Sequence, residues 1–92
     1  KDAPKAFKLL SGNDKCHGEN PSLNPKAKHF NNDGSIDFGL FQWNDYWNGF
    51  NKKVNNERYL FDYKIATNLA YRKFLNDEYS FREWTSGKCQ GI

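Results

Sequence analysis

The sequence contains few of the residues that build metal centres, and it has no long apolar run. Among 92 residues there are two cysteines and two histidines, with no CxxC motif and no His/Cys cluster. A zinc site needs several such ligands at short spacing, so no metal is predicted, and nothing else in the sequence indicates a cofactor. No apolar stretch approaches the length of a membrane-spanning helix, so we expect no membrane span.

Clustered positive charge is also absent. Fourteen Lys and Arg against eleven Asp and Glu give a net charge of +3, and basic runs such as Lys52-Lys53 are short. A surface that binds nucleic acid carries basic residues in a patch or stripe, so no nucleic-acid partner is expected. Short basic runs are typical of a solvated surface, and the alternative is steering toward a polyanion such as a bacterial cell wall.

The two cysteines, Cys16 and Cys89, lie near opposite ends of the chain. A disulfide between them would close a long loop and stabilise the fold by roughly 4 kcal/mol, whereas the alternative is two free buried thiols. A bridge would indicate an oxidising compartment. The first ten residues lack the pattern of a signal peptide, so we expect a mature form, an excised domain or export by other means.

Aromatic residues are abundant. Eight Phe, five Tyr and three Trp make up 17 % of the chain, and such side chains can fill a core that has few aliphatic residues. This content argues against intrinsic disorder. The length suits one small domain over residues 1–92, which we expect to be a monomer.

The N-terminal segment is expected to be helical. A proline in the first turn and Gly12 after it predict a helix over residues 3–10. Residues 16–19 are expected to be the end of another helical turn, because Pro21 disfavours helix immediately before it. Glu19 would then lie at or near a helix end.

The middle of the chain carries a turn signal. Asn32-Asp33-Gly34 tolerate positive φ and predict a tight turn. The arms of the resulting hairpin are expected at residues 29–31 and 35–38, with Gly39 breaking the second arm. Helical turns over residues 40–47 are expected to follow.

The C-terminal third predicts two more helices. Apolar residues four apart predict the main helix over residues 60–75. Ser80 and Glu83 have the spacing of a capping box for a short last helix over residues 81–86, which Gly87 would end. A mostly helical chain with one small β-hairpin belongs to the α+β class.

Two acids, Glu19 and Asp37, suggest glycosidic chemistry. A glycosidase needs one carboxyl group that is protonated at working pH and, in most cases, a second that is ionised, and the environment separates their pKa values. Glu19 facing an aromatic cleft would be the acid, and Asp37 on a polar hairpin would be the ionised partner. The amides of Asn31, Gln42 and Asn44 could hold a carboxylate or sugar hydroxyls.

Aromatic side chains divide between core and cleft. Trp47, with Tyr46, is the candidate for stacking on a sugar ring. Trp43, Phe38 and Phe41 are expected in the core. Taken alone, one Glu and one Asp among eleven acidic residues are weak support, because most acids are surface charges.

The run NNDGSIDFGLFQWN, residues 31–44, resembles the hairpin of animal-type (chicken-type) lysozymes. The family pattern is Asn-x-Asp-Gly-Ser-x-Asp-Tyr-Gly followed by two hydrophobic residues, Gln, a hydrophobic residue and Asn, with Phe38 here in place of Tyr. Compact bacterial and phage lytic transglycosylases of the same superfamily are similar too, through GENPSLNPKA, GLFQW and the aromatic C-terminal segment. The resemblance covers roughly residues 14 to 89.

The resemblance implies a lysozyme-like fold whose hairpin carries the second carboxylate. It implies that Glu19 is the general acid and that Asp37 is the nucleophile or electrostatic stabiliser. The positions that it assigns to substrate are Asn31, Gln42, Asn44, the stacking residue Trp47 and the cleft-wall residue Phe81. It also implies a disulfide between Cys16 and Cys89.

The chain departs from the family in two ways. It is shorter, with one possible bridge where animal lysozymes have more. Glu19 also lies five residues before Asn24, where the family usually has four, so an ungapped alignment places Asn20 at the acid position. We assign Glu19, because a one-residue bulge at Pro21 absorbs the difference. Asn20 at that position would leave a binder without turnover.

The predicted function is therefore cleavage of the β-1,4 bond between N-acetylmuramic acid and N-acetylglucosamine in peptidoglycan. One alternative is a lytic transglycosylase that forms 1,6-anhydro products, and another is a non-catalytic protein that binds glycan. The expected partner is peptidoglycan or a chitin-like oligosaccharide. The expected location is secreted or extracytoplasmic, with association to a phage or virion included.

Overall fold

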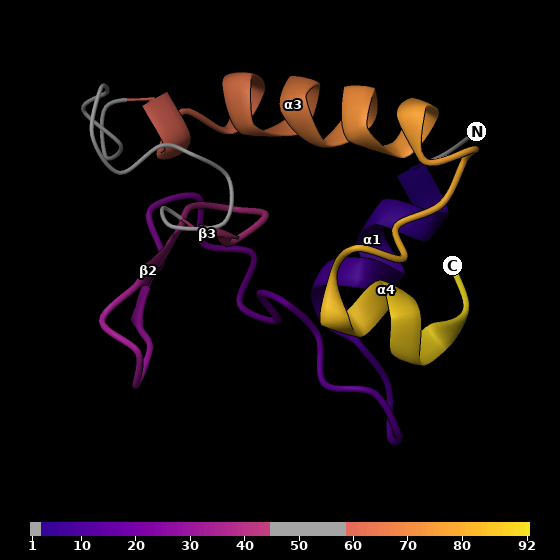
Figure 1. Ribbon diagram of the computed structural model, residues 1–92, viewed down its shortest axis with the longest axis horizontal. Coiled ribbons are helices and arrows are strands. Elements are labelled where there is room, and N and C mark those ends of the chain that lie inside the picture. Colours follow the sequence, from indigo (N-terminus) through magenta and orange to yellow (C-terminus); the bar gives the residue numbers. More distant parts are fainter. Residues whose placement is uncertain (1–2, 45–58) are drawn as a thin grey trace.

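Three helices and a three-stranded antiparallel sheet make up the residues that the computed structural model describes, 3–44 and 59–92. In chain order these elements are α1 (Ala3–Ser11), β1 (Lys28–Phe30), β2 (Ile36–Phe38), β3 (Trp43–Asn44), α3 (Tyr63–Asn76) and α4 (Thr85–Gln90). Helix α3 runs along one edge of the molecule, with the sheet below one of its ends and the α1–α4 pair below the other (Figure 1). The α+β class is confirmed.

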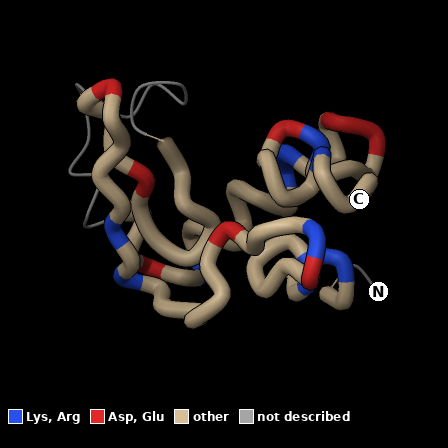
Figure 2. The backbone as a smooth tube through the Cα atoms, turned by 90° about the horizontal axis from the view of Figure 1, so that it is seen from below, with Lys and Arg blue, Asp and Glu red and all other residues tan. Residues whose placement is uncertain are grey.

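The sheet has the strand order β1-β2-β3. Its first turn forms as the sequence predicts, with the Asn31 N–H donating to the Ser35 carbonyl at 2.9 Å and the Asp33 carboxylate accepting from the Ser35 N–H at 2.9 Å. Asp37 lies opposite Asn44 in the register, so these two side chains share one face of the sheet. Acidic positions occur at the tip and on one arm of this hairpin, with basic positions at its base (Figure 2).

The helical turns expected over residues 40–47 are wrong where the structure describes the chain. Residues 43–44 instead form the third strand, β3, and pair with β2. The chain reverses between Gly39 and Gln42, where the Gln42 N–H donates to the Gly39 carbonyl at 3.1 Å. Pairing with the preceding strand β2 therefore decided the structure of a segment whose local residues also suit a helix.

The main helix, α3, forms with its predicted buried stripe. Ala66, Ala70 and Phe74, each four residues apart, are fully or almost fully buried. The helix begins at Tyr63 rather than at residue 60 because the carboxylate of Asp62 accepts from the backbone N–H groups of the first turn.

The predicted helix over residues 81–86 is wrong in position. Helix α4 begins at Thr85, and Gly87 lies inside it instead of ending it. A side chain at Gly87 would place its Cβ 2.0 Å from the Phe81 carbonyl oxygen, so the glycine lets α4 pack directly against the preceding segment. The helical turn expected at residues 16–19 is also wrong, because none of these residues is helical and His17 pairs with Gly12 in an isolated antiparallel bridge.

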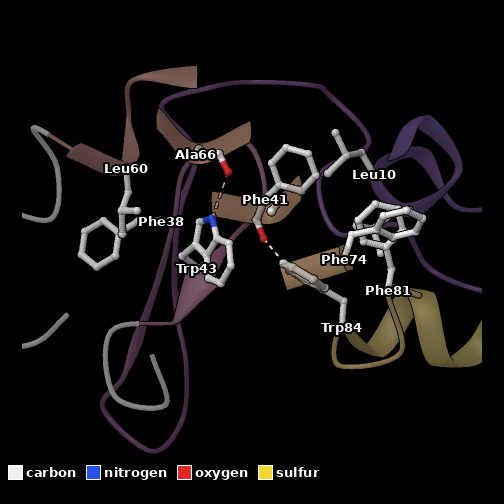
Figure 3. Close-up of a cluster of buried hydrophobic side chains, with 11 residues drawn as sticks. Leu10, Phe38, Phe41, Trp43, Leu60, Ala66, Phe74, Phe81 and Trp84 are labelled. Carbon is white, nitrogen blue, oxygen red and sulfur yellow. Dashed lines mark hydrogen bonds between the residues drawn. The ribbon is translucent and has the colours of Figure 1, made fainter. Parts of the chain in front are cut away.

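Aromatic rings build the core, as their abundance suggests. The cluster consists of Leu9, Leu10, Phe38, Phe41, Trp43, Leu60, Ala66, Ala70, Phe74, Phe81 and Trp84. Both tryptophans satisfy their indole N–H groups inside it, Trp43 on the Ala66 carbonyl at 3.4 Å and Trp84 on the Phe41 carbonyl at 2.9 Å (Figure 3). The core positions expected for Phe38, Phe41 and Trp43 are confirmed.

A disulfide joins Cys16 to Cys89, with 5.8 Å between their Cα atoms, so the expectation of a bridge is confirmed. The bond links the loop after α1 to helix α4. Across the described ranges, no helix combines the length and the apolar character that crossing a membrane requires.

Replacing both cysteines by alanine should lower the free energy of unfolding by about 4 kcal/mol, because the closed loop no longer restricts the unfolded chain. Thermal unfolding followed by circular dichroism measures the effect, and reduction of the parent protein by dithiothreitol should reproduce it. A melting temperature that neither treatment changes would contradict a stabilising role for the bridge.

Candidate functional site

The backbone of Glu19 is fixed to the end of helix α1. The N–H groups of Glu19 and Asn20 donate to the carbonyls of Leu9 and Leu10 at 3.1 and 3.0 Å. Carbonyls in the last turn of a helix lack a partner within the helix, and this loop supplies one to each. Gly18 permits the contact, because a Cβ there would lie 2.2 Å from the Leu10 carbonyl oxygen.

The side chain of Glu19 caps helix α4. Trp84 occupies the N-cap position and supplies no side-chain acceptor, so the Ser86 N–H donates instead to the Glu19 carboxylate at 2.9 Å. An anionic acceptor at a helix N-terminus is electrostatically favourable. This bond joins two residues that are 67 positions apart in the chain.

Helix α4 is also held to α1. The Gln90 side-chain amide donates to the Lys8 carbonyl at 2.7 Å and to the buried Ser86 hydroxyl at 3.0 Å. Cys89, in the same helix, forms the disulfide to the loop that precedes Glu19. Helix α4 is therefore held to the N-terminal part of the chain at both of its ends.

Asn20, the alternative residue for the acid position, has a structural role. Its buried side chain donates to the carbonyls of Asn24, Gly39 and Leu40 at 2.8, 3.3 and 3.2 Å. Its amide oxygen accepts from Ser22 and from the Asn24 N–H. These bonds tie the loop after Glu19 to the end of β2, and of the two neighbours it is Glu19 that lines the open cleft described next.

A cleft of about 780 Å³ lies between the sheet and the segment that leads into α4. Its lining residues are Glu19, Asn31, Asn32, Asp33, Ser35, Asp37, Gln42, Trp43, Asn44, Lys73, Glu83, Trp84 and Thr85. Five of the seven residues predicted for catalysis or substrate binding therefore come together.

Of the other two residues, the structure describes Phe81, which does not join them. Phe81 is buried in the core, with its ring 4.5 Å from that of Phe74, and it does not reach the cleft. Trp84, three residues later, lines the cleft in its place. Trp47 lies outside the described residues, so its predicted stacking role stays a prediction.

A polar network surrounds Asp37. The Asn44 amide donates to the Asp37 carboxylate at 2.9 Å and to the Ser35 hydroxyl at 2.9 Å. Asn31 donates to the same hydroxyl at 3.2 Å, and that hydroxyl donates to Asp33 at 2.6 Å. Asp37 therefore has a polar environment in which its charge is hydrogen-bonded.

Gln42 is oriented by backbone contacts. Its side-chain amide nitrogen donates to the Gly39 carbonyl at 2.9 Å and to the Ala27 carbonyl at 3.3 Å. Its backbone has a φ of 51°, a left-handed conformation that is uncommon for a residue with a side chain. The side-chain amide of Gln42 is therefore held in one orientation in the cleft wall.

The environment of Glu19 raises the pKa of its carboxyl group above the ordinary value of 4.5. Burial is the largest cause, and the nearby charge of Asp37 acts in the same direction. The hydrogen bond from the Ser86 N–H and the charge of His17 oppose the rise. Glu19 thus keeps its proton to a higher pH than an ordinary glutamic acid.

Sequence reasoning assigned to the site none of the four lining residues that come from α3 and the C-terminal segment, namely Lys73, Glu83, Trp84 and Thr85. The aromatic segment YSFREW was noticed, yet which of its rings faces the cleft depends on core packing. Lys73 gave no signal, because a lysine on a helix looks like a surface charge. Among the described residues, no group of three His, Cys, Asp or Glu side chains is placed to hold a metal ion.

No protein-family model matches the chain, and searches of curated proteins and of solved structures also find no match. The function of the cleft must therefore be inferred from its own residues and chemistry.

The raised pKa of Glu19 predicts how stability depends on pH. The folded state binds this proton more tightly than the unfolded state, so the stabilising contribution is full below the unfolded pKa. It is lost as the pH rises through the folded pKa. Glu19→Gln cannot ionise and retains an oxygen that can accept from Ser86, so its melting temperature should rise relative to the parent as the pH increases from below to above the ordinary glutamic acid pKa of 4.5.

The control for this measurement is Glu78→Gln, at an exposed acid that does not line the cleft. Its melting temperature should follow that of the parent across the same range. If the parent instead gains on Glu19→Gln as the pH rises, the pKa of Glu19 is not raised in the folded state.

Proposed function

We propose that this protein is a glycoside hydrolase that cleaves the β-1,4 bond between N-acetylmuramic acid and N-acetylglucosamine in peptidoglycan. The observation that carries the proposal is that Glu19 and Asp37 line one open cleft in contrasting environments. Burial raises the pKa of the half-buried Glu19, whereas the Asp37 carboxyl group accepts a hydrogen bond from the Asn44 side-chain amide. Such an arrangement suits a proton donor on one side of the bond and a hydrogen-bonded carboxyl group on the other.

Glu19 would start the reaction by protonating the oxygen that bridges the two sugars. A general acid works best when its pKa lies near the working pH, and the rise in the pKa of Glu19 moves it in that direction. The contact with the Ser86 N–H fixes one carboxylate oxygen. The other oxygen is then the one that would carry the proton.

Asp37 would stabilise or capture the positive charge that develops on the sugar as the bond breaks. Its contact with Asn44 fixes the carboxylate on the sheet side of the cleft. Glu19, now ionised, would remove a proton from water, and the water would attack the sugar with retention of configuration. Lysozymes divide the two roles in this way, and residues 31–44 resemble the hairpin motif of that family.

The cleft walls suit a carbohydrate. Amide groups of Asn31, Gln42 and Asn44 can bind sugar hydroxyls or acetamido groups, and the rings of Trp43 and Trp84 provide apolar surface beneath them. We therefore include a compact lysozyme-like fold in the proposal, with Trp84 taking the wall position first given to Phe81. The disulfide supports a secreted or extracytoplasmic location, where peptidoglycan is found.

Glu19→Gln should reduce the release of reducing ends from peptidoglycan by about a hundredfold to ten-thousandfold, because the amide cannot donate the catalytic proton. Asp37→Asn should also reduce the rate strongly. Turbidity clearing and reducing-end assays measure both variants, and Glu78→Gln serves as the control with parental activity. Undiminished cleavage by Glu19→Gln would remove Glu19 from the mechanism.

The products separate hydrolysis from the two alternatives. Hydrolysis gives ordinary reducing ends, whereas a lytic transglycosylase gives 1,6-anhydromuramic ends that are lighter by one water, as mass spectrometry resolves. Wall binding that persists without any cleavage by the parent would identify a glycan-binding protein instead.

A further inference from the structure

Lys73 and Glu83 line the cleft from its helical side, and the proposed chemistry uses neither. Lys73 comes from the last turns of α3, and Glu83 from the segment just before α4. The Lys73 ammonium lies 3.1 Å from a Glu83 carboxylate oxygen and 3.6 Å from one of Asp77. An ammonium and a carboxylate thus lie side by side at the cleft surface.

Asp77 explains why the ammonium of Lys73 is held in place. Asp77 is buried, and its Oδ2 atom accepts no hydrogen bond from the described part of the chain. A buried charge is costly unless an opposite charge compensates it, so Lys73 is needed there. Lysine has three N–H donors, and the close contact with Glu83 uses one of them, so a donor remains that can serve a ligand.

Glu83, unlike Lys73, does not compensate a buried charge. Its side chain is 50 % exposed, and an exposed ion pair contributes little to folding. Its carboxylate is nevertheless oriented by Lys73, and the same contact lowers the pKa of Glu83 below its ordinary value. The pair therefore presents a fixed acceptor and a fixed donor next to each other.

The charges around the pair disfavour an anionic ligand. Lys73 and Arg82 are balanced by Asp77 and Glu83, and the Arg82 guanidinium is engaged by the Asp77 carbonyl oxygen. Among the described residues, the rest of the cleft lining adds three more carboxyl groups and no further cation, namely Glu19, Asp33 and Asp37. A phosphate or carboxylate would be repelled here. A neutral hydroxyl, which donates one hydrogen bond and accepts another, matches the pair.

We propose that Lys73 and Glu83 form a subsite that binds a sugar hydroxyl of the glycan on the helical side of the cleft. The subsite rests on the proposed function, since it requires a glycan in the cleft. A hydroxyl donates to Glu83 and accepts from Lys73. The contact is made to a sugar in the ground state as well as in the transition state, so it acts on binding and leaves the chemical step unchanged.

The test measures binding without turnover. The Glu19→Gln variant serves as the background, and the probe is a neutral hexasaccharide of β-1,4-linked N-acetylglucosamine, titrated by calorimetry. Adding Glu83→Ala should weaken binding by about tenfold, the loss expected for one hydrogen bond to a charged group. Adding Glu78→Ala, at an exposed acid away from the cleft, should leave the affinity unchanged. Glu83→Ala is preferred to a change at Lys73, which would leave Asp77 buried and uncompensated.

A second measurement uses the active protein with soluble glycan substrate. Glu83→Ala should raise KM by about tenfold at unchanged kcat, because it removes uniform binding. A fall in kcat at unchanged KM would overturn the subsite, since it would make Glu83 part of the chemical step. A probe that carries muramic carboxylates and binds more tightly than the neutral probe, with an affinity that falls steeply with salt, would also overturn it.

The outcomes separate the two proposals. Equal affinity of the Glu83→Ala and Glu78→Ala variants overturns the subsite, while cleavage by the parent still supports the hydrolase. If the Glu19→Gln background binds no hexasaccharide and the parent cleaves no wall, both proposals fail. Thermal melting of each variant shows whether a loss of affinity comes from a loss of folding.

Discussion

The hydrogen bond from the Ser86 N–H to the Glu19 carboxylate determines how the cleft is built. It gives an acceptor to a backbone N–H at the N-terminus of α4, where the N-cap residue supplies no side-chain hydrogen bond. It also fixes the proposed acid at the cleft wall. The packing around it serves this contact. Gly18 lets the Glu19 loop approach α1, Gly87 lets α4 approach Phe81, and the disulfide ties the two segments together. One bond thus links the stability of the C-terminal segment to the position of a candidate catalytic group.

That link carries an internal conflict. The carboxylate is useful as a helix cap because it is negative, while its burial and the nearby Asp37 favour the neutral form. The balance leaves a group that is easier to protonate than an ordinary glutamic acid. For folding alone, a neutral hydrogen-bond acceptor at this position would avoid the conflict. Stability alone therefore does not explain why the residue is an acid.

Much of the fold follows from local signals in the sequence. The Asn32-Asp33-Gly34 turn places the hairpin, and four-residue apolar spacing places α3. The errors occur where pairing and packing between elements, rather than local propensity, decide the structure. Strand β3 forms because residues 43–44 find β2, and α4 is displaced because Trp84 is buried in the core before the helix begins. No local pattern reports such contacts.

The same division holds for the candidate site. Asn31, Asp37 and Asn44 are brought together by neighbouring strands, so a short motif was enough to find them. Glu19 was found as a residue, but its position beside the end of α1 was not, since residues 16–19 were expected to be helical. Lys73 and Trp84 enter the cleft only through the packing of α3 against the C-terminal segment. The sequence therefore indicated the sheet side of the site far better than its helical side.

Asn20 holds the two sides of the cleft together. This residue directly follows Glu19, and its side-chain amide holds the carbonyl of Gly39, which lies two residues after Asp37. The loop that carries Glu19 and the end of β2 are consequently joined by hydrogen bonds. The loop that carries Glu19 is thus tied to the end of the strand that carries Asp37 before any ligand binds, so binding need not bring these two segments together.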